Sequence, residues 1–150
     1  MFALVTALLA LLSGATASHA GPLDEAFLRR HLEAIAKGTL EPVAQAYAHD
    51  AVLDWVGGGL EGRYSGRESI RAVWARYLAN QAPVRIHLEA IESHTNDKGA
   101  TVIASVLYAG RQSSVKVRQA MSLRDGKINT EIWQIAPGLA IPQGRTEPAR

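Results

Sequence analysis

Near the carboxyl end of the chain, one carboxylate alternates with large apolar residues. Glu131, Trp133 and Ile135 are two residues apart, so in a strand their side chains point to one face. A carboxyl group beside tryptophans in an apolar cavity has a raised pKa, which suits general acid or base catalysis near neutral pH. Glu131 is therefore the first catalytic candidate. The structural alternative is that Glu131 pairs with an arginine or lies at a rim.

The second catalytic candidate is a histidine on a predicted helix. His31 recurs with Phe27 and Ile35 every four residues, which puts the three side chains on one helix face. An imidazole changes charge near neutral pH, so we expect His31 to act as the partner of Glu131. The alternative is a core histidine, because its neighbours on this face are apolar.

Composition and spacing exclude other chemistry. The chain has no cysteine, which excludes disulfides, thiol nucleophiles and thiolate metal sites. His49, Asp50 and Asp54 lack the spacing of metal ligands, and no HxH or HExxH motif occurs. His87 and His94 are an odd number of residues apart on one predicted strand, so we expect them on opposite faces. We expect no metal and no cofactor.

The length and charge of the chain restrict its partners. With 150 residues, 47% of them apolar, the chain supports one domain with a real core. The formal charge is only +2, and basic residues do not interleave with aromatic ones, so we expect no nucleic-acid partner.

The first twenty residues are predicted to be a signal peptide. Residues 1–12 are almost wholly apolar, and Ser18-His19-Ala20 is a cleavage motif, with Ala15-Thr16-Ala17 as an alternative. The apolar run is shorter than the roughly 20 residues that span a bilayer, so we expect no stable membrane insertion. The protein is therefore predicted to be exported, to the periplasm or outside the cell.

Helix signals dominate the first half of the remaining chain. Pro22 opens a predicted helix that Gly38 ends, and Thr39 is the expected N-cap of a second helix that runs through Tyr47. A capping box at residues 65–68 precedes a third helix. Its predicted buried face consists of Ile70, Val73, Trp74, Tyr77 and Leu78.

Strand signals dominate the second half. After Pro83 the apolar residues alternate, and turn signals at 96–99, 109–111 and 125–126 separate about four antiparallel strands. A short earlier strand is predicted at residues 52–56. Helices on one side of a strongly curved antiparallel sheet make an α+β fold that encloses a cavity. We predict one domain over residues 21–136 and a loose tail over residues 137–150.

Three motifs carry a resemblance to a known superfamily. They are Tyr47-Ala48-His49-Asp50-Ala51-Val52, Gly66-Arg67-Glu68-Ser69-Ile70 at a helix start, and Asp125-Gly126-Lys127-Ile128 before a strand with Trp133. Over residues 23–135 the chain resembles the nuclear transport factor 2-like superfamily, and within it the SnoaL-like and ketosteroid-isomerase-like group. The resemblance implies a cone-shaped curved sheet packed against three N-terminal helices. It implies no single activity, because the superfamily includes isomerases, cyclases, dehydratases, epoxide hydrolases and non-catalytic binders.

The resemblance does not imply steroid isomerisation. Ketosteroid isomerases use a helix tyrosine and a strand aspartic acid as hydrogen-bond donors and a first-strand aspartate as base. Aligned without gaps, these positions hold His31, Gln119 and Trp55, so the base is missing. Asp54 is adjacent, but alternation points it to the other face unless glycines 57–59 allow a one-residue slip. His31 and Gln119 remain candidate donors to a ligand oxygen.

The resemblance places the face of Glu131 on a cavity. The expected lining, either as cavity wall or as structural core, is Trp55, Trp74, Tyr77, Gln119, Glu131 and Trp133, with Asp54 as a further ligand contact. We therefore expect a binder of a small, mostly apolar or aromatic molecule, with cofactor-free acid/base catalysis by Glu131 and His31. The alternative is a non-catalytic binding or dimeric assembly module of the cell envelope. An enzyme would keep an open cavity with a carboxylate, whereas a module would have a filled core and an apolar outer sheet face.

Basic residues are expected on the outer face of the sheet. Arg85, Arg111, Lys116 and Arg118 fall on predicted solvent faces, where they solubilise the sheet or pair across a dimer. Because relatives of this fold often dimerise through that face, the resemblance implies a homodimer.

Overall fold

A computed structural model describes residues 22–138 of the protein, with side chains described from Asp24 onward. The elements in chain order are α1 (Pro22–Lys37), α2 (Leu40–Gln45), β1 (Tyr47–Val56), β2 (Gly62–Ser65), α3 (Arg67–Gln81), β3 (Arg85–Asn96), β4 (Gly99–Ala109), β5 (Ser114–Arg124) and β6 (Lys127–Ile135). Three helices and one sheet make the expected α+β fold.

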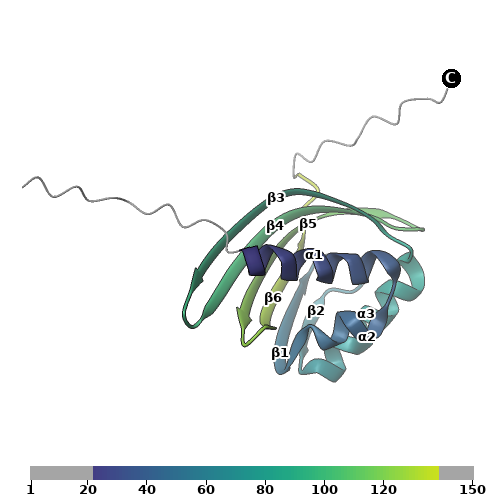
Figure 1. The fold of residues 1–150 in the computed structure, drawn as a ribbon. Coiled ribbons are helices and arrows are strands. Elements are labelled where there is room, and N and C mark those ends of the chain that lie inside the picture. Colours follow the sequence, from purple (N-terminus) through teal and green to yellow (C-terminus); the bar gives the residue numbers. More distant parts are fainter. Residues whose placement is uncertain (1–21, 139–150) are drawn as a thin grey trace, which may run out of the picture.

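The six strands form one sheet in the order β2-β1-β6-β5-β4-β3. All neighbouring strands are antiparallel except β1 and β6, which are parallel. The prediction of a purely antiparallel sheet is therefore wrong at this one pair. The last strand, β6, returns to lie beside β1 and runs in the same direction. Figure 1 shows the sheet curling around α1, with α2 and α3 together at one end.

The helices lie where the sequence indicated, but neither expected side-chain cap forms. Thr39 takes the N-cap position of α2 without a side-chain capping bond. Gly38 ends α1 with a φ of 74°, and Val73 and Trp74 lie on the buried face of α3. The predicted capping box is wrong, because Ser65 pairs with Val52 in the sheet and Gly66 takes the N-cap position without a side-chain bond. Pairing in β2 outweighs the local capping preference of Ser65.

Two strand boundaries also differ from the sequence prediction. The second helix ends at Gln45, and Tyr47 begins β1 because it pairs with Ile128 of β6. The strand β1 is thus longer than the predicted 52–56. The short strand β2 was not predicted, and β1 and β2 lie between α2 and α3, so the helices do not all precede the strands.

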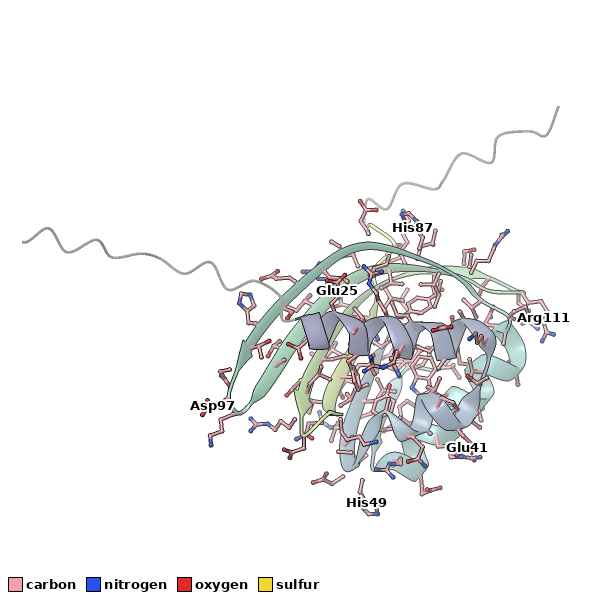
Figure 2. All side chains as sticks on the ribbon, in the orientation of Figure 1. Glu25, Glu41, His49, His87, Asp97 and Arg111 are labelled. Atoms are coloured by element: carbon pink, nitrogen blue, oxygen red, sulfur yellow. The ribbon has the colours of Figure 1, made fainter. Side chains whose placement is uncertain are left out.

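The two histidines of β3 lie on one face, contrary to the prediction. His87 is opposite Leu107 and His94 is opposite Thr101, which are six residues apart on β4 and thus on the same face. The register shift between Leu88 and Ala90 changes the alternation of the intervening residues. In Figure 2 the labelled His87 and His49 point outward on well-separated parts of the molecule.

Two predicted segments fall outside the described residues: the signal peptide at 1–20 and all but the first two residues of the tail at 137–150. Export and the domain limits 21–136 therefore stay predictions. Within residues 22–138, no helix has the length and apolar character needed to cross a membrane.

The end of α1 packs so closely that its glycine is predicted to be irreplaceable. A Cβ at Gly38 would lie 2.7 Å from the Cβ of Ala82, whereas a Cβ at Gly126, where φ is 69°, would meet nothing within 4 Å. The left-handed conformation alone costs about 1–2 kcal/mol for alanine, and overpacking adds about 1–3 kcal/mol. Gly38→Ala should therefore lower the free energy of unfolding by about 3 kcal/mol and Gly126→Ala by about 1 kcal/mol, as measured by urea denaturation. Equal losses would show that the contact with Ala82 relaxes without penalty.

Candidate functional site

Glu131 lies at the centre of the core and is hydrogen-bonded on both carboxylate oxygens. It is only 1% exposed, on the inner face of β6. The Tyr47 hydroxyl donates to Oε2, and the Gln119 amide nitrogen donates to Oε1 over 2.5 Å. Tyr47 begins β1 and Gln119 lies on β5, the two neighbours of β6 in the sheet. The parallel β1–β6 pair therefore supplies the partner that sequence reasoning missed.

The hydrogen bonds continue on both sides of Glu131. The Trp74 indole nitrogen on α3 donates to the Tyr47 oxygen over 2.8 Å, and the Tyr108 hydroxyl on β4 donates to the Gln119 side-chain oxygen over 2.7 Å. All five side chains are buried. We call Trp74, Tyr47, Glu131, Gln119 and Tyr108 the Glu131 network.

Burial controls the ionisation of this network. Removal from water raises the pKa of Glu131 from 4.5 to about 7, against the lowering effect of the hydrogen bonds from Tyr47 and Gln119. Burial also raises the pKa of Tyr47 and of Tyr108 well above the ordinary value, so both phenols keep their protons. At neutral pH the network therefore has one group, Glu131, that gains and loses a proton.

His31 lies beside the network without a hydrogen bond to it. Its ring is 5.7 Å from the Tyr47 ring and 6.2 Å from the Trp74 ring, measured between centroids. Both ring nitrogens are buried and have no hydrogen-bond partner. Burial lowers the pKa of His31 to about 4, so the imidazole is neutral at pH 7. The two catalytic candidates are thus close but not bonded, since Tyr47 occupies the place expected for His31.

The aromatic residues predicted from the sequence come together as a cluster. The rings of Trp55 and Trp133 are 4.0 Å apart between centroids, and Tyr77 lies 5.5 Å from Trp55 and 5.6 Å from Trp133. Trp74 contacts the same three rings. These rings pack directly against each other in the core, so the described interior is filled rather than open around Glu131.

Asp54 is the one predicted site residue that does not face the core. It is part-exposed, paired in register with Ile132 of β6, and its carboxylate lies 3.3 Å from the Arg63 guanidinium. The one-residue slip considered at glycines 57–59 does not occur, because Trp55 stays opposite Trp133 on the inner face. Asp54 therefore belongs to the outer face.

Sequence reasoning missed Tyr47 and Tyr108. The sequence predicts Tyr47 within a helix, although Tyr47 begins the first of the three motifs that carry the resemblance and in the structure begins β1. Tyr108 lies two residues beyond Val106 in an alternating strand and could have been assigned to the inner face from that spacing. Among the described residues, no three His, Asp or Glu side chains gather as metal ligands would.

The comparison with known proteins agrees with this architecture. The chain matches the family model of the SnoaL-like domain over residues 28–130. No curated protein sequence matches it significantly.

Several solved structures have the same fold at low sequence identity. An NTF2-like protein of unknown function from Pseudomonas putida KT2440 is 16% identical, with a TM-score of 0.65 over 74% of this chain and 82% of that one. A putative calcium/calmodulin-dependent protein kinase II association domain from Xanthomonas campestris is 21% identical, with a TM-score of 0.65 over 77% and 87%. A putative aromatic ring hydroxylase from Novosphingobium aromaticivorans is 18% identical, with a TM-score of 0.64 over 80% and 88%.

These likenesses establish the fold and leave the activity open, since proteins of one fold carry out different functions. Because the family match spans residues 28–130, well over half of the chain, the protein belongs to the SnoaL-like domain family and has the NTF2-like fold.

Proposed function

We propose that this SnoaL-like protein binds a small, mostly apolar molecule among the aromatic rings of the cone and exchanges a proton with it through Glu131. The reaction would be of the isomerase, cyclase or hydratase type and would need no cofactor. The observation that carries the proposal is the buried carboxyl group of Glu131, with a pKa of about 7.

A carboxyl group at this position is expensive for a purely structural core. Burying an ionised carboxylate costs several kcal/mol, and buried polar networks are often no more stable than an apolar core of the same shape. Two polar side chains, those of Tyr47 and Gln119, bond Glu131 directly, and Trp74 bonds the Tyr47 oxygen behind it. Such an arrangement is typical of sites where a pKa is adjusted for proton transfer.

The network has the parts that proton exchange with an oxygen-containing ligand requires. A group with a pKa near 7 is able to give and to take a proton at physiological pH. The Tyr47 hydroxyl, supported by the Trp74 N–H, is a donor that stabilises negative charge developing on a ligand oxygen. Glu131 and Tyr47 are thus the proposed acid/base group and donor, in place of the expected Glu131 and His31.

The filled interior restricts how a ligand would enter. Trp55 and Tyr77 keep 3% and 6% exposure, whereas Trp133 and Trp74 keep none. To reach Glu131, a ligand must displace the rings of Trp55 and Tyr77. Its own contacts with the remaining rings then replace the contacts that these two rings made. This requirement favours a flat or apolar molecule over a polar one.

The filled interior also favours a second function, that of a non-catalytic assembly module. Val56 and Ile132 are the large apolar side chains left exposed, at 41% and 45%, among the described residues. They lie on the outer face of the neighbouring strands β1 and β6, beside Asp54 of β1 and Arg63 of β2. We propose dimerisation through this face as the alternative.

The ligand hypothesis predicts pH-dependent binding of ketones. A carbonyl oxygen accepts a hydrogen bond from protonated Glu131 but is repelled by the carboxylate. Affinity for progesterone or acetophenone should therefore fall about tenfold between pH 6 and pH 8, across the pKa of about 7. Quenching of tryptophan fluorescence measures the affinity, because Trp55 and Trp133 line the proposed site.

Two variants control this titration. Glu131→Gln should abolish the pH dependence, because the amide cannot ionise, while its oxygen still accepts the hydrogen bond from Tyr47. Glu33→Gln removes an exposed carboxylate that pairs with Lys37 on α1 and should change nothing. A flat response to both ketones at both pH values, or a pH dependence that survives in Glu131→Gln, would contradict the proposal.

Folding stability should reveal the proton on Glu131 without any ligand. Its pKa is raised from 4.5 to about 7, so its stabilising contribution is complete below pH 4.5 and is lost as the pH rises to about 7. His31 behaves oppositely: its pKa falls from 6.5 to about 4, so its contribution is complete above pH 6.5 and is lost as the pH falls to about 4. Each loss is about 3 kcal/mol.

Between pH 4.5 and 6.5 the opposite effects of Glu131 and His31 on the free energy of unfolding should cancel in the wild type. Single substitutions should separate the two effects. Glu131→Gln keeps only the effect of His31, so its free energy of unfolding should rise with pH relative to the wild type. His31→Leu keeps only the effect of Glu131, so its free energy of unfolding should fall with pH relative to the wild type. Urea denaturation at several pH values measures both differences. Parallel curves for the wild type and Glu131→Gln would show that Glu131 has an ordinary pKa.

The assembly hypothesis predicts a dimer that one surface charge disrupts. Ile132→Lys places an ammonium in the exposed apolar patch and should convert the dimer into a monomer, because a buried unpaired charge is costly. Gln112→Lys adds the same charge in the exposed turn between β4 and β5 and should leave the dimer intact. Sedimentation velocity measures the oligomeric state of the wild type and of both variants. A monomeric wild type would contradict the assembly hypothesis.

A further inference from the structure

A surface hollow opens beside His31, between α1, α2 and the turn that joins β5 to β6. Its volume is about 280 Å³, near the lower limit for small-molecule sites. We call this hollow the α1–α2 pocket. Its walls are mainly apolar, and the residues that matter for its chemistry are Phe27, Arg30, His31, Ala34, Pro42 and Gln45.

His31 gives this pocket an unused hydrogen-bonding group. The residue is 3% exposed, and neither ring nitrogen has a partner. A neutral imidazole has one donor and one acceptor nitrogen, and buried polar atoms are normally paired. The Phe27 ring lies nearly parallel to the His31 ring, at 6.4 Å between centroids and an angle of 16°. His31 belongs to the pocket lining, but both nitrogens are closed to solvent, so a ligand beside Phe27 would reach one of them only as the imidazole turns toward it.

Arg30 gives the pocket an unpaired positive charge. The neighbouring exposed cations of α1 are paired along the helix, Arg29 with Glu25 and Lys37 with Glu33. Arg30 has alanines at the positions four residues before and after it, and it forms no ion pair within the described residues. Arg30 is also the one charged residue of the pocket lining within that part of the chain.

The surroundings of the pocket add positive charge. Gln45 in the lining accepts a hydrogen bond from Lys127 on its backbone oxygen, over 2.6 Å, and one from Arg67 on its side chain, over 3.4 Å. Asp24 and Asp125 line the adjoining hollow rather than this one, although Arg30 borders both. The local field therefore favours an anion at the mouth of the α1–α2 pocket.

We propose that the α1–α2 pocket binds a small carboxylate with an aromatic or aliphatic body. The Arg30 guanidinium binds the carboxylate, for which its planar donors are suited. The body lies against Phe27, Ala34 and Pro42, and one nitrogen of His31 bonds an oxygen of the ligand. This site is distinct from the proposed ketone site at Glu131, and it is tested with a different class of ligand.

Phenylacetate and 2-phenylethanol test the proposal, since they share a ring and differ in charge. Isothermal titration calorimetry on the full-length chain should show saturable binding of phenylacetate and at least tenfold weaker binding of the alcohol. Arg30→Gln should weaken phenylacetate binding at least tenfold. Arg29→Gln removes the same charge from the adjacent residue of α1 and should leave the affinity within twofold.

A second variant examines the histidine. His31→Leu keeps the apolar volume and should weaken phenylacetate binding several-fold, with circular dichroism confirming that the variant folds. No saturable binding of phenylacetate would overturn the proposal. So would equal weakening by Arg29→Gln and Arg30→Gln, because it would show attraction to the net charge rather than to a site. Unchanged affinity in His31→Leu would remove His31 from the site and refute its assigned role.

Discussion

The hydrogen bond from Tyr47 to Glu131 connects parts of the protein that are 84 residues apart in the chain. It joins the start of β1 to β6, and through Trp74 it joins both strands to α3. The bond is buried, so leaving either partner alone would cost the full desolvation of that group. This one polar contact within an apolar core therefore links α3 to the parallel β1–β6 pair, in addition to the backbone pairing of the strands and the apolar packing of the helix.

The features predictable from the sequence are those that local periodicity determines. The stripe of α3 and the alternation of β5 and β6 placed Trp74, Gln119 and Glu131 on the inner face, as the structure has them. The features that escaped prediction depend on distant partners. Tyr47 has no local reason to leave a helix, and only its pairing with Ile128 makes it a strand residue. The register shift in β3 likewise follows from its pairing with β4 and reversed the expectation for His94.

In the candidate site, too, the sequence predicts which side chains face inward but not which of them contact each other. Alternation predicts that Glu131 and Trp133 face inward, but it does not predict which donor reaches the carboxylate. The sequence offered His31, whose ring centroid lies 5.7 Å from that of Tyr47, but it is the Tyr47 hydroxyl that bonds the carboxylate. Whether the aromatic rings fill the space inside the sheet also depends on the curvature of the whole sheet. Whether a cone is open or packed is therefore not a property of any one segment.

The neutral state of His31 is a condition for the raised pKa of Glu131. Removal from water keeps the imidazole uncharged at neutral pH, and the same removal keeps the Glu131 carboxyl protonated up to a pH of about 7. An imidazolium one ring away would stabilise the carboxylate and lower its pKa, because charges interact strongly in a low-dielectric interior. Tyr47, which contacts the His31 ring and bonds Glu131, stays protonated and neutral, since burial and the nearby Glu131 raise its pKa well above the ordinary value. With His31 and Tyr47 both neutral, neither places a charge beside Glu131, which remains the group that titrates near pH 7.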